Sequence, residues 1–238
     1  MPLIAERGDM EKPLKNRTEA GRLLAEKLTA YANREDVIVL GLPRGGVPVA
    51  YEIAKKLNAP LDVFVVRKLG VPWQEELAMG AIATGGVRVL NDEVVKAYGI
   101  SDDKIALVEA KEQKELERRE RAYRGDRSAL DVHGRTVILV DNGVATGTTI
   151  RAGLAALRKL EPSRIVVAVA VAPQSTCEEL KTESDEVVCL FAPEILYAIS
   201  LWYERFTQTT DEEVRDLLAR ALKQQTASAS TGSGIVSD

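Results

Sequence analysis

The amino-acid sequence predicts an α/β fold: a doubly wound, mostly parallel sheet flanked by helices. Residues 137–140 and 165–171 are unbroken apolar runs, typical of parallel strands that are buried on both faces. Such runs alternate with amphipathic helical stretches along the chain, the order expected of βαβ units. Gly-rich or polar segments follow several of the runs, where open α/β sheets bind their ligands. The fold class therefore also predicts where to search for a site.

The first half of the chain is expected to contain a helix from residue 16 or 18 with Ala20, Leu23, Leu24, Leu28 and Tyr31 on one face. A strand at 37–40, a helix starting near Pro48 and ending near Asn58, and a strand at 61–66 follow. Residues 69–86 are expected to form a mobile loop that returns through a short strand. A strand at 87–90 and a short helix capped by Asn91 complete this half.

The second half begins with a long helix, from Ser101 to about Arg124, with opposite charges four residues apart. After a connector at 126–135 come the strand 137–140, a helix, the strand 165–171, a short helix and a strand at 186–190. Thr210 and Glu213 form a capping box that opens a final helix. Residues 1–225 are expected to form a single domain, and 226–238, rich in Ser, Thr and Gly, a disordered tail.

Composition excludes several classes of protein. The 238 residues are 45% hydrophobic and 29% charged, as in ordinary globular proteins, and the net charge of −4 makes nucleic acid an unlikely partner. No apolar run could cross a membrane and no signal peptide is evident, so we expect a cytoplasmic protein. Cys177 and Cys189 lack metal-type spacing and are expected to be reduced thiols. His133 is the only histidine and lies in a polar connector, which argues against a Ser-His-Asp triad or a histidine metal site.

The segment 137–151 is the most informative part of the sequence. Asp141 stands at the carboxyl end of its strand, and small residues at 143, 145 and 147 let a ligand approach the backbone closely. Hydroxyl side chains cluster near the start of the next helix, whose orphan amides and positive dipole end favour an anion. The segment therefore predicts a phosphate site, with an ordinary tight turn as the alternative.

This segment resembles the phosphoribosyl pyrophosphate (PRPP) motif of type I phosphoribosyltransferases: four apolar residues, two acidic residues, two small or apolar residues, then Ala/Thr-Thr-Gly-x-Thr. It departs from that pattern at the second acidic position, which is Asn142. The resemblance implies that Asp141 and Asn142 hold the ribose and that Asp141 places Mg²⁺ through water. Asn142 lowers the negative charge near the ion. The 5′-phosphate would bind at Ala145, Thr146, Gly147, Thr148 and Thr149.

The turn at 41–46 is a second ligand-facing segment, and it fits neither a dinucleotide fingerprint nor a Walker motif. In the family the corresponding turn binds pyrophosphate, often through a non-proline cis peptide, which we expect at Arg44–Gly45. Arg44, Gly45 and Gly46 would then meet pyrophosphate; a plain turn with an exposed arginine is the alternative.

Arg67 and Lys68 are expected at the end of the neighbouring strand, where two adjacent cations suit pyrophosphate. The orotate branch of the family has a similar pair, although a solvated pair closing the strand is the alternative.

The resemblance also implies a small hood, from about 1–17 and 191–225, with residues 69–86 as a flexible cover over the ribose. Trp202, Tyr203 and Phe206 allow two interpretations: Trp202 and Tyr203 stack on the acceptor base, or the cluster pins the last helix to the domain. Residues 42–50, 77–83 and 202–206 are similar to a bacterial branch of the family. The resemblance thus covers about residues 16–222.

The implied reaction is transfer of the 5-phosphoribosyl group from PRPP to a nitrogenous base or other nitrogen nucleophile, with release of pyrophosphate. It would depend on Mg²⁺, with Asp141, Asn142, Arg67 and Lys68 as the catalytic residues of a homodimer. The 6-oxopurine enzymes have an aspartate where this chain has Ala145, which disfavours hypoxanthine and guanine. A PRPP- or nucleotide-sensing regulator and a phosphoribosyl hydrolase are the alternatives.

Overall fold

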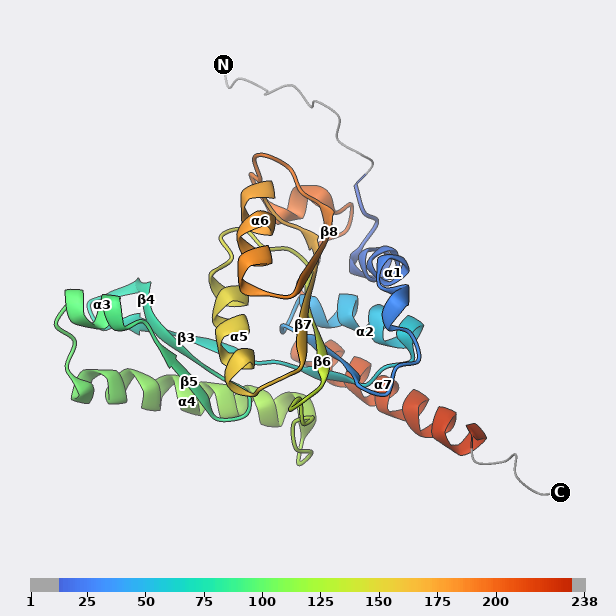
Figure 1. Ribbon diagram of the computed structural model, residues 1–238, viewed down its shortest axis with the longest axis horizontal. Helices are drawn as coiled ribbons and strands as arrows, with labels where there is room; N and C mark the ends of the chain where they lie inside the picture. The colour runs from blue at the N-terminus through green and yellow to red at the C-terminus, as the bar shows by residue number, and fades with distance from the viewer. Residues whose placement is uncertain (1–12, 233–238) are drawn as a thin grey trace, which may run out of the picture.

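The computed structural model describes residues 13–232 and contains a five-stranded, entirely parallel sheet (Figure 1). Its strands, in the spatial order β2-β1-β6-β7-β8, are β2 (Leu61–Val63), β1 (Val37–Gly41), β6 (Thr136–Asp141), β7 (Arg164–Val171) and β8 (Glu186–Phe191). The chain winds outward in one direction from β1 and in the other from β6, so their shared edge is the point where the strand order reverses. The doubly wound parallel fold that the sequence predicts is confirmed.

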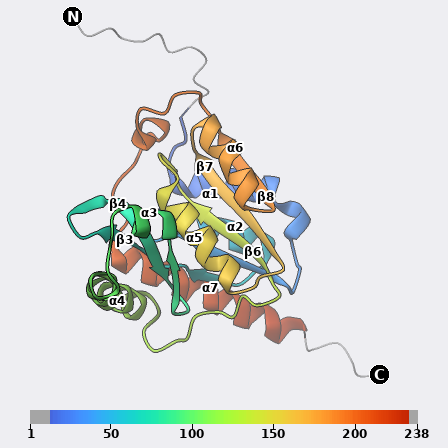
Figure 2. The ribbon, with the colours of Figure 1, turned by 60° about the vertical axis from the view of Figure 1, so that its left-hand side comes forward.

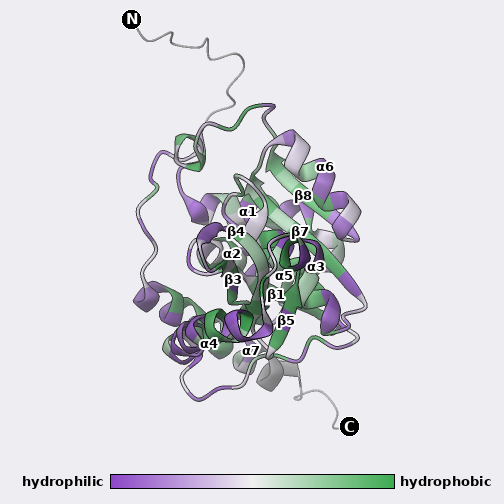
Figure 3. Cartoon of the chain, turned by 90° about the vertical axis from the view of Figure 1, so that its left-hand side faces the viewer, coloured by the Kyte–Doolittle hydropathy of each residue, from purple (hydrophilic) through white to green (hydrophobic). Residues whose placement is uncertain are grey.

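Helices cover both faces of this sheet because alternate strand residues point to opposite sides. One core joins Val37 and Val39 of β1 to α1 (Arg17–Lys27), α2 (Gly46–Leu57) and α7 (Asp211–Gly232). The other joins Ile38 and Leu40 to α5 (Thr148–Lys159) and α6 (Gln174–Glu183). In Figure 1 the two sets lie to the right and left of β7, and Figure 3 shows hydrophobic strands inside with hydrophilic residues on the outer helices.

A second sheet projects to one side of the first (Figures 1 and 2), and two expectations are corrected here. It is antiparallel and contains β3 (Val66–Val71), β4 (Gln74–Ala83) and β5 (Val87–Leu90). The expected strand 61–66 is therefore two strands in two sheets, and residues 69–86 are mainly strand rather than a loop. Burial explains the difference, because Leu69, Val71 and Met79 are wholly enclosed. Together with α3 (Asp92–Ala97) and α4 (Asp102–Arg124), this sheet forms what we call the arm.

A buried ion pair ties the arm to the main sheet. Arg124, at the end of α4, donates from Nε to Oδ1 and Oδ2 of Asp62 at 2.8 and 2.9 Å, and from a terminal nitrogen to the carbonyl of Val63 at 2.6 Å. Both side chains are buried. The end of α4 is thereby fixed against β2.

Several helix boundaries follow the capping signals in the sequence. The Asn16 side chain accepts a hydrogen bond from the Glu19 amide, and Asn91 does the same for Val94. At the start of α7, Thr210 Oγ1 accepts from the Glu213 amide at 3.1 Å. Two short 3₁₀ helices, η1 (Thr29–Tyr31) and η2 (Ile199–Trp202), complete the element list.

The ends of the predicted domain are partly corrected. The helix α7 continues to Gly232, so residues 226–232 are helical where a disordered tail was expected, and 233–238 lie outside the described residues. Of the expected hood, residues 1–12 also lie outside them. The remaining segments lie side by side, because the Leu14 amide donates to the carbonyl of Trp202 and the Glu204 amide to that of Leu14.

Two further sequence expectations concern the cysteines and membrane segments. Cys177 of α6 and Cys189 of β8 are paired with each other, which corrects the expectation of two reduced thiols. None of the helices formed by residues 13–232 combines the length and the apolar character needed to cross a membrane.

Candidate functional site

Asp141 ends β6 at the edge where the strand order reverses, and its carboxylate is tied to the chain that follows. Oδ1 accepts a hydrogen bond from the Asn142 amide at 2.7 Å. Burial raises the pKa of Asp141 to about 7, against the opposing influence of the Asn142 and Gly143 amides and the positive charge of Arg17. The Asp141 carboxyl group therefore changes between its neutral and its charged form near neutral pH.

The turn after Asp141 presents unused backbone donors. Gly147 has φ +77°, a left-handed conformation that glycine adopts without strain, and α5 begins directly after it. Within residues 13–232, no acceptor is hydrogen-bonded to the amides of residues 145–149. Thr146 and Thr148 place their hydroxyl oxygens 3.2 Å apart beside them. Free amides, hydroxyls and the positive end of α5 together form a site suited to a phosphate group.

The turn between β1 and α2 lies directly against the end of β6. A Cβ atom on Gly46 would stand 2.5 Å from the carbonyl oxygen of Val140, and one on Gly45 would stand 2.0 Å from Oδ1 of Asn142. The Leu42 amide donates to the Val140 carbonyl at 2.9 Å. Glycine at 45 and 46 thus lets this turn pack closely against the end of β6 and the Asn142 side chain.

The expected cis peptide is present in this turn but one bond earlier. It joins Pro43 and Arg44, whereas the sequence had led us to expect it between Arg44 and Gly45. The Arg44 side chain lies 3.7 Å from Oδ1 of Asp211, which also accepts a hydrogen bond from the Tyr123 hydroxyl at 3.1 Å. Arg44 is thereby directed toward the start of α7.

Arg67 and Lys68 are not at the end of a main-sheet strand. They belong to β3 in the arm, because the chain leaves the main sheet after Val63. Arg67 Nε donates to Oε2 of Glu112 on α4 at 2.8 Å, and Lys68 Nζ to the carbonyl of Glu76 at 3.2 Å. Both line a hollow of about 500 Å³ between β3, β4 and α4. Within residues 13–232, neither Arg67 nor Lys68 forms an ion pair with a residue of the β1–α2 turn or of the turn after β6.

The aromatic cluster contacts the chain just after Asp141. Tyr203 is buried, and its hydroxyl donates to the carbonyl of Asn142 at 2.6 Å. The ring of Trp202 packs 5.2 Å from that of Phe191, and the ring of Phe206 lies 5.0 Å from that of Tyr203. These contacts support the interpretation that the cluster pins its segment to the domain.

Arg17 is a site residue that the sequence reasoning missed. It opens α1, yet its guanidinium reaches across to the other end of the chain, with one terminal nitrogen donating to the Thr207 carbonyl at 2.7 Å. Its Nε lies 3.5 Å from the position of a Cβ on Gly45. The signal available in the sequence was a cation directly after the capping Asn16, where the helix dipole disfavours positive charge.

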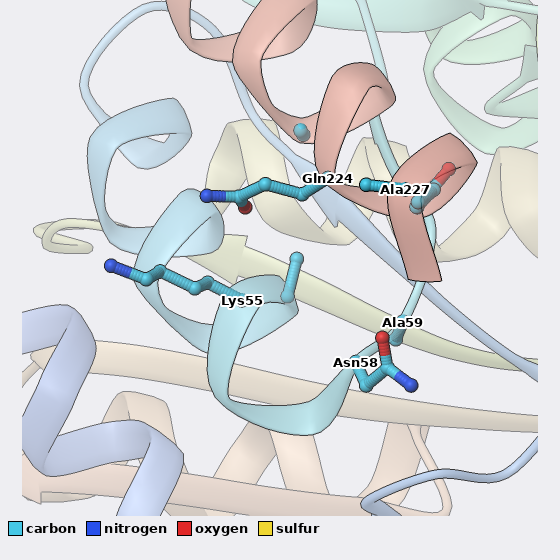
Figure 4. Close-up of a pocket in the computed structure, with 8 residues that line it drawn as sticks. Lys55, Asn58, Ala59, Gln224 and Ala227 are labelled. Carbon is cyan, nitrogen blue, oxygen red and sulfur yellow. The ribbon is translucent and has the colours of Figure 1, made fainter. Parts of the chain in front are cut away.

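A groove of about 370 Å³ between α2 and α7 is separate from this site (Figure 4). Lys55, Asn58 and Ala59 line it from the carboxyl end of α2. Because α2 begins at the turn after β1 and leads back to the start of the parallel strand β2, its carboxyl end lies near the amino-terminal ends of the strands. The groove therefore takes no part in the arrangement around Asp141.

Comparison with known proteins agrees with this geometry. The chain is 47% identical over 206 residues to "Putative phosphoribosyl transferase Rv0571c" and to "Putative phosphoribosyl transferase MT0597", from two strains of Mycobacterium tuberculosis. The match covers 87% of this chain and 46% of each relative, so the chain spans about half the length of these curated proteins.

The crystal structure of TT1426 from Thermus thermophilus superposes with a TM-score of 0.79 at 40% identity, covering 88% of this chain and 99% of that one. The profile of the "Phosphoribosyl transferase domain" family matches residues 12–195, which include both turns, the arm and all five main-sheet strands. The chain therefore belongs to the phosphoribosyl transferase domain family and has its type I fold.

Proposed function

We propose that this chain transfers the 5-phosphoribosyl group of PRPP to a nitrogenous base and releases pyrophosphate. The observation that supports this most is the free backbone N–H groups of residues 145–149, which lie directly after Asp141 at the edge where the strand order reverses. Family membership favours the same reaction.

Each part of PRPP has a matching group in the two turns. The 5′-phosphate binds to the amides and hydroxyls of Ala145, Thr146, Gly147, Thr148 and Thr149, and the ribose hydroxyls bind to Asp141 and Asn142. The pyrophosphate lies at Arg44, Gly45 and Gly46: the Gly46 amide already donates to the Leu42 carbonyl, so the Gly45 amide is the backbone donor offered to the ligand, and the Arg44 guanidinium adds positive charge. The close packing of Gly45 and Gly46 against the end of β6 then sets the spacing between phosphate and pyrophosphate.

A magnesium ion fits this site only in company with the substrate. Residues 13–232 contain no cluster of three or more His, Cys, Asp or Glu side chains that could hold a metal. Mg²⁺, however, is commonly held by one or two carboxylates together with substrate phosphates and water. We propose that Asp141 supplies that carboxylate through a water molecule; the ion, when bound, neutralises charge on the pyrophosphate.

In the reaction, the bond from ribose C1 to the pyrophosphate oxygen breaks as the bond from the base nitrogen to C1 forms. The chain contributes by orienting the ribose at Asp141 and by stabilising the leaving group with fixed donors. Arg67 and Lys68 could bind pyrophosphate only by giving up their present hydrogen bonds to Glu112 and Glu76. Their catalytic role, base stacking by Trp202 and Tyr203, and the homodimer stay predictions.

The decisive assay mixes the protein with Mg²⁺, PRPP and a panel of bases and follows pyrophosphate. Release that requires a base supports transfer, with adenine-, uracil- or orotate-type acceptors favoured over hypoxanthine and guanine. Release without a base identifies a hydrolase, and saturable binding without release a sensor. We expect Asp141→Ala to abolish PRPP binding while the far-ultraviolet circular dichroism spectrum stays unchanged; wild-type affinity in this variant would contradict the proposal.

A further inference from the structure

The guanidinium of Arg17 is held in a fixed orientation by contacts with residues 206 and 207. It stacks on the ring of Phe206, with the carbon atom 4.2 Å from the ring centre, and one terminal nitrogen is bonded to the Thr207 carbonyl. Two contacts on different sides fix the plane of the group. Because the orientation is fixed before any ligand arrives, little conformational entropy remains to be lost on binding.

Several donors of this group remain unused in the described part of the chain, and one of them, Nε, is enclosed. Arg17 Nε is buried and donates to no acceptor within residues 13–232. A buried donor of a charged group left without a partner is costly, and the positive end of α1 adds to that cost. Burial lowers the pKa of Arg17, in keeping with a cation that lacks full compensation. Packing alone therefore does not explain why an arginine occupies this position.

The position of the Arg17 guanidinium indicates which part of the substrate it can contact. Nε lies beside Gly45, in the turn between β1 and α2, and the electrostatic influence of Arg17 extends to Asp141. Its surroundings are therefore the pyrophosphate side of the proposed site rather than the amides of residues 145–149.

We propose that Arg17 is a substrate-binding residue whose free terminal N–H groups donate to an oxygen of the pyrophosphate group of PRPP. The inference rests on the proposed function and adds a third cationic group, beside Arg44 and Mg²⁺, that stabilises the leaving group. A charge-assisted hydrogen bond of this kind strengthens as negative charge moves onto pyrophosphate.

The test compares Arg17→Gln and Arg17→Lys with the matched control Arg22→Gln. Arg22 lies further along α1, exposed and paired with Glu52 across the surface. Calorimetric titrations use inorganic pyrophosphate with Mg²⁺, PRPP with Mg²⁺, and ribose 5-phosphate. We expect Arg17→Gln to weaken pyrophosphate and PRPP at least tenfold and to leave ribose 5-phosphate within twofold. Arg17→Lys should also weaken pyrophosphate binding, and Arg22→Gln should change nothing.

Two results would overturn the inference: wild-type affinity for pyrophosphate in Arg17→Gln, or an equal loss for pyrophosphate and ribose 5-phosphate, which marks a purely structural role. Should Arg17→Gln not fold, Arg17→Lys, which keeps the charge, decides by the same criteria. Failure of the proposed function is a separate result, since the wild-type protein would then bind no PRPP or show no release of pyrophosphate that requires a base. If the wild-type protein releases pyrophosphate and Arg17→Gln keeps the wild-type affinity for it, only the role of Arg17 is overturned.

Discussion

At the scale of single residues, the candidate site depends on the absence of a side chain at Gly46 and on the charge of Asp141. Gly46 has no room for a side chain, because the nearest atom to an added Cβ would be a main-chain oxygen that cannot rotate away. Asp141 is held where burial opposes its ionisation. Both features lie at the end of β6, and each predicts a measurable change in stability.

We expect Gly46→Ala to lower the free energy of unfolding by about 1–3 kcal/mol, because the new methyl group would stand 2.5 Å from the Val140 oxygen. Gly153→Ala is the matched control: its Cβ would meet side chains at 3.5 Å or more, in the middle of α5. This control should be neutral or stabilising by up to about 1 kcal/mol. Urea denaturation measures both; equal effects of the two changes would contradict the argument.

The raised pKa of Asp141 makes stability depend on pH. Between the unfolded value of 3.8 and the folded value of about 7, the folded chain binds more protons than the unfolded chain. Asp141 therefore makes the free energy of unfolding fall as pH rises through this window, by at most about 1.4 kcal/mol per pH unit. The loss levels off once pH has passed the folded pKa.

Asp141→Asn should remove this contribution, so its stability relative to wild type should increase from pH 4 to pH 7 and then level off. Denaturation curves with a chelator, to exclude Mg²⁺, provide the measurement, and Asp126→Asn in the exposed connector is the control. A constant difference between Asp141→Asn and wild type across the window would refute the prediction.

At the scale of elements, the arm depends on the buried pair of Arg124 and Asp62. The carboxylate accepts from both the guanidinium and the Leu130 amide, so it is satisfied only while α4 and the following connector stay docked. Removing one member leaves the other charge buried without its partner, which is far more costly than losing an exposed pair.

We expect Arg124→Met to lower the free energy of unfolding by about 3–5 kcal/mol. The control Arg118→Met removes an exposed partner of Glu115 on the same helix and should cost less than about 1 kcal/mol. Thermal and urea unfolding distinguish the two, and Asp62→Asn combined with Arg124→Met should recover part of the loss. Similar effects of Arg124→Met and Arg118→Met would show that burial of the pair contributes nothing.

At the scale of the whole molecule, the main sheet and the arm differ in how deeply they are enclosed. Every residue of β7 except the first is completely buried between two layers of helices. The strand β4 begins with three exposed residues and becomes buried only toward its end. Local opening should therefore begin in the arm.

Amide hydrogen exchange can detect this difference. We expect the amides of β6 and β7 to exchange only with global unfolding, and those at the start of β4 and in α3, which has no buried residue, to exchange through openings of lower free energy. Uniform protection across both sheets would contradict this division of the molecule.

Much of the fold could be predicted because its signals are local. Capping side chains such as Asn16 and Thr210 fixed helix starts within a residue, since they bond to amides three positions away. The strands β6 and β7 were evident from unbroken apolar runs. The strands β3 and β4 were missed because Gly and small residues in 77–83 weaken the alternation that marks a strand, and pairing of β4 with β3 and β5 supplies what local propensity does not.

The sequence by itself determined the parallel sheet, the small-residue turn after Asp141 and the family, because apolar periodicity and motif spacing act between residues that are close along the chain. Only the tertiary structure decided the surroundings of those turns. It placed Arg67 and Lys68 in the arm, since the chain changes sheets after Val63. It also brought Arg17 and Phe206, from opposite ends of the chain, together beside Gly45. Such contacts depend on packing between distant segments, which no local pattern records.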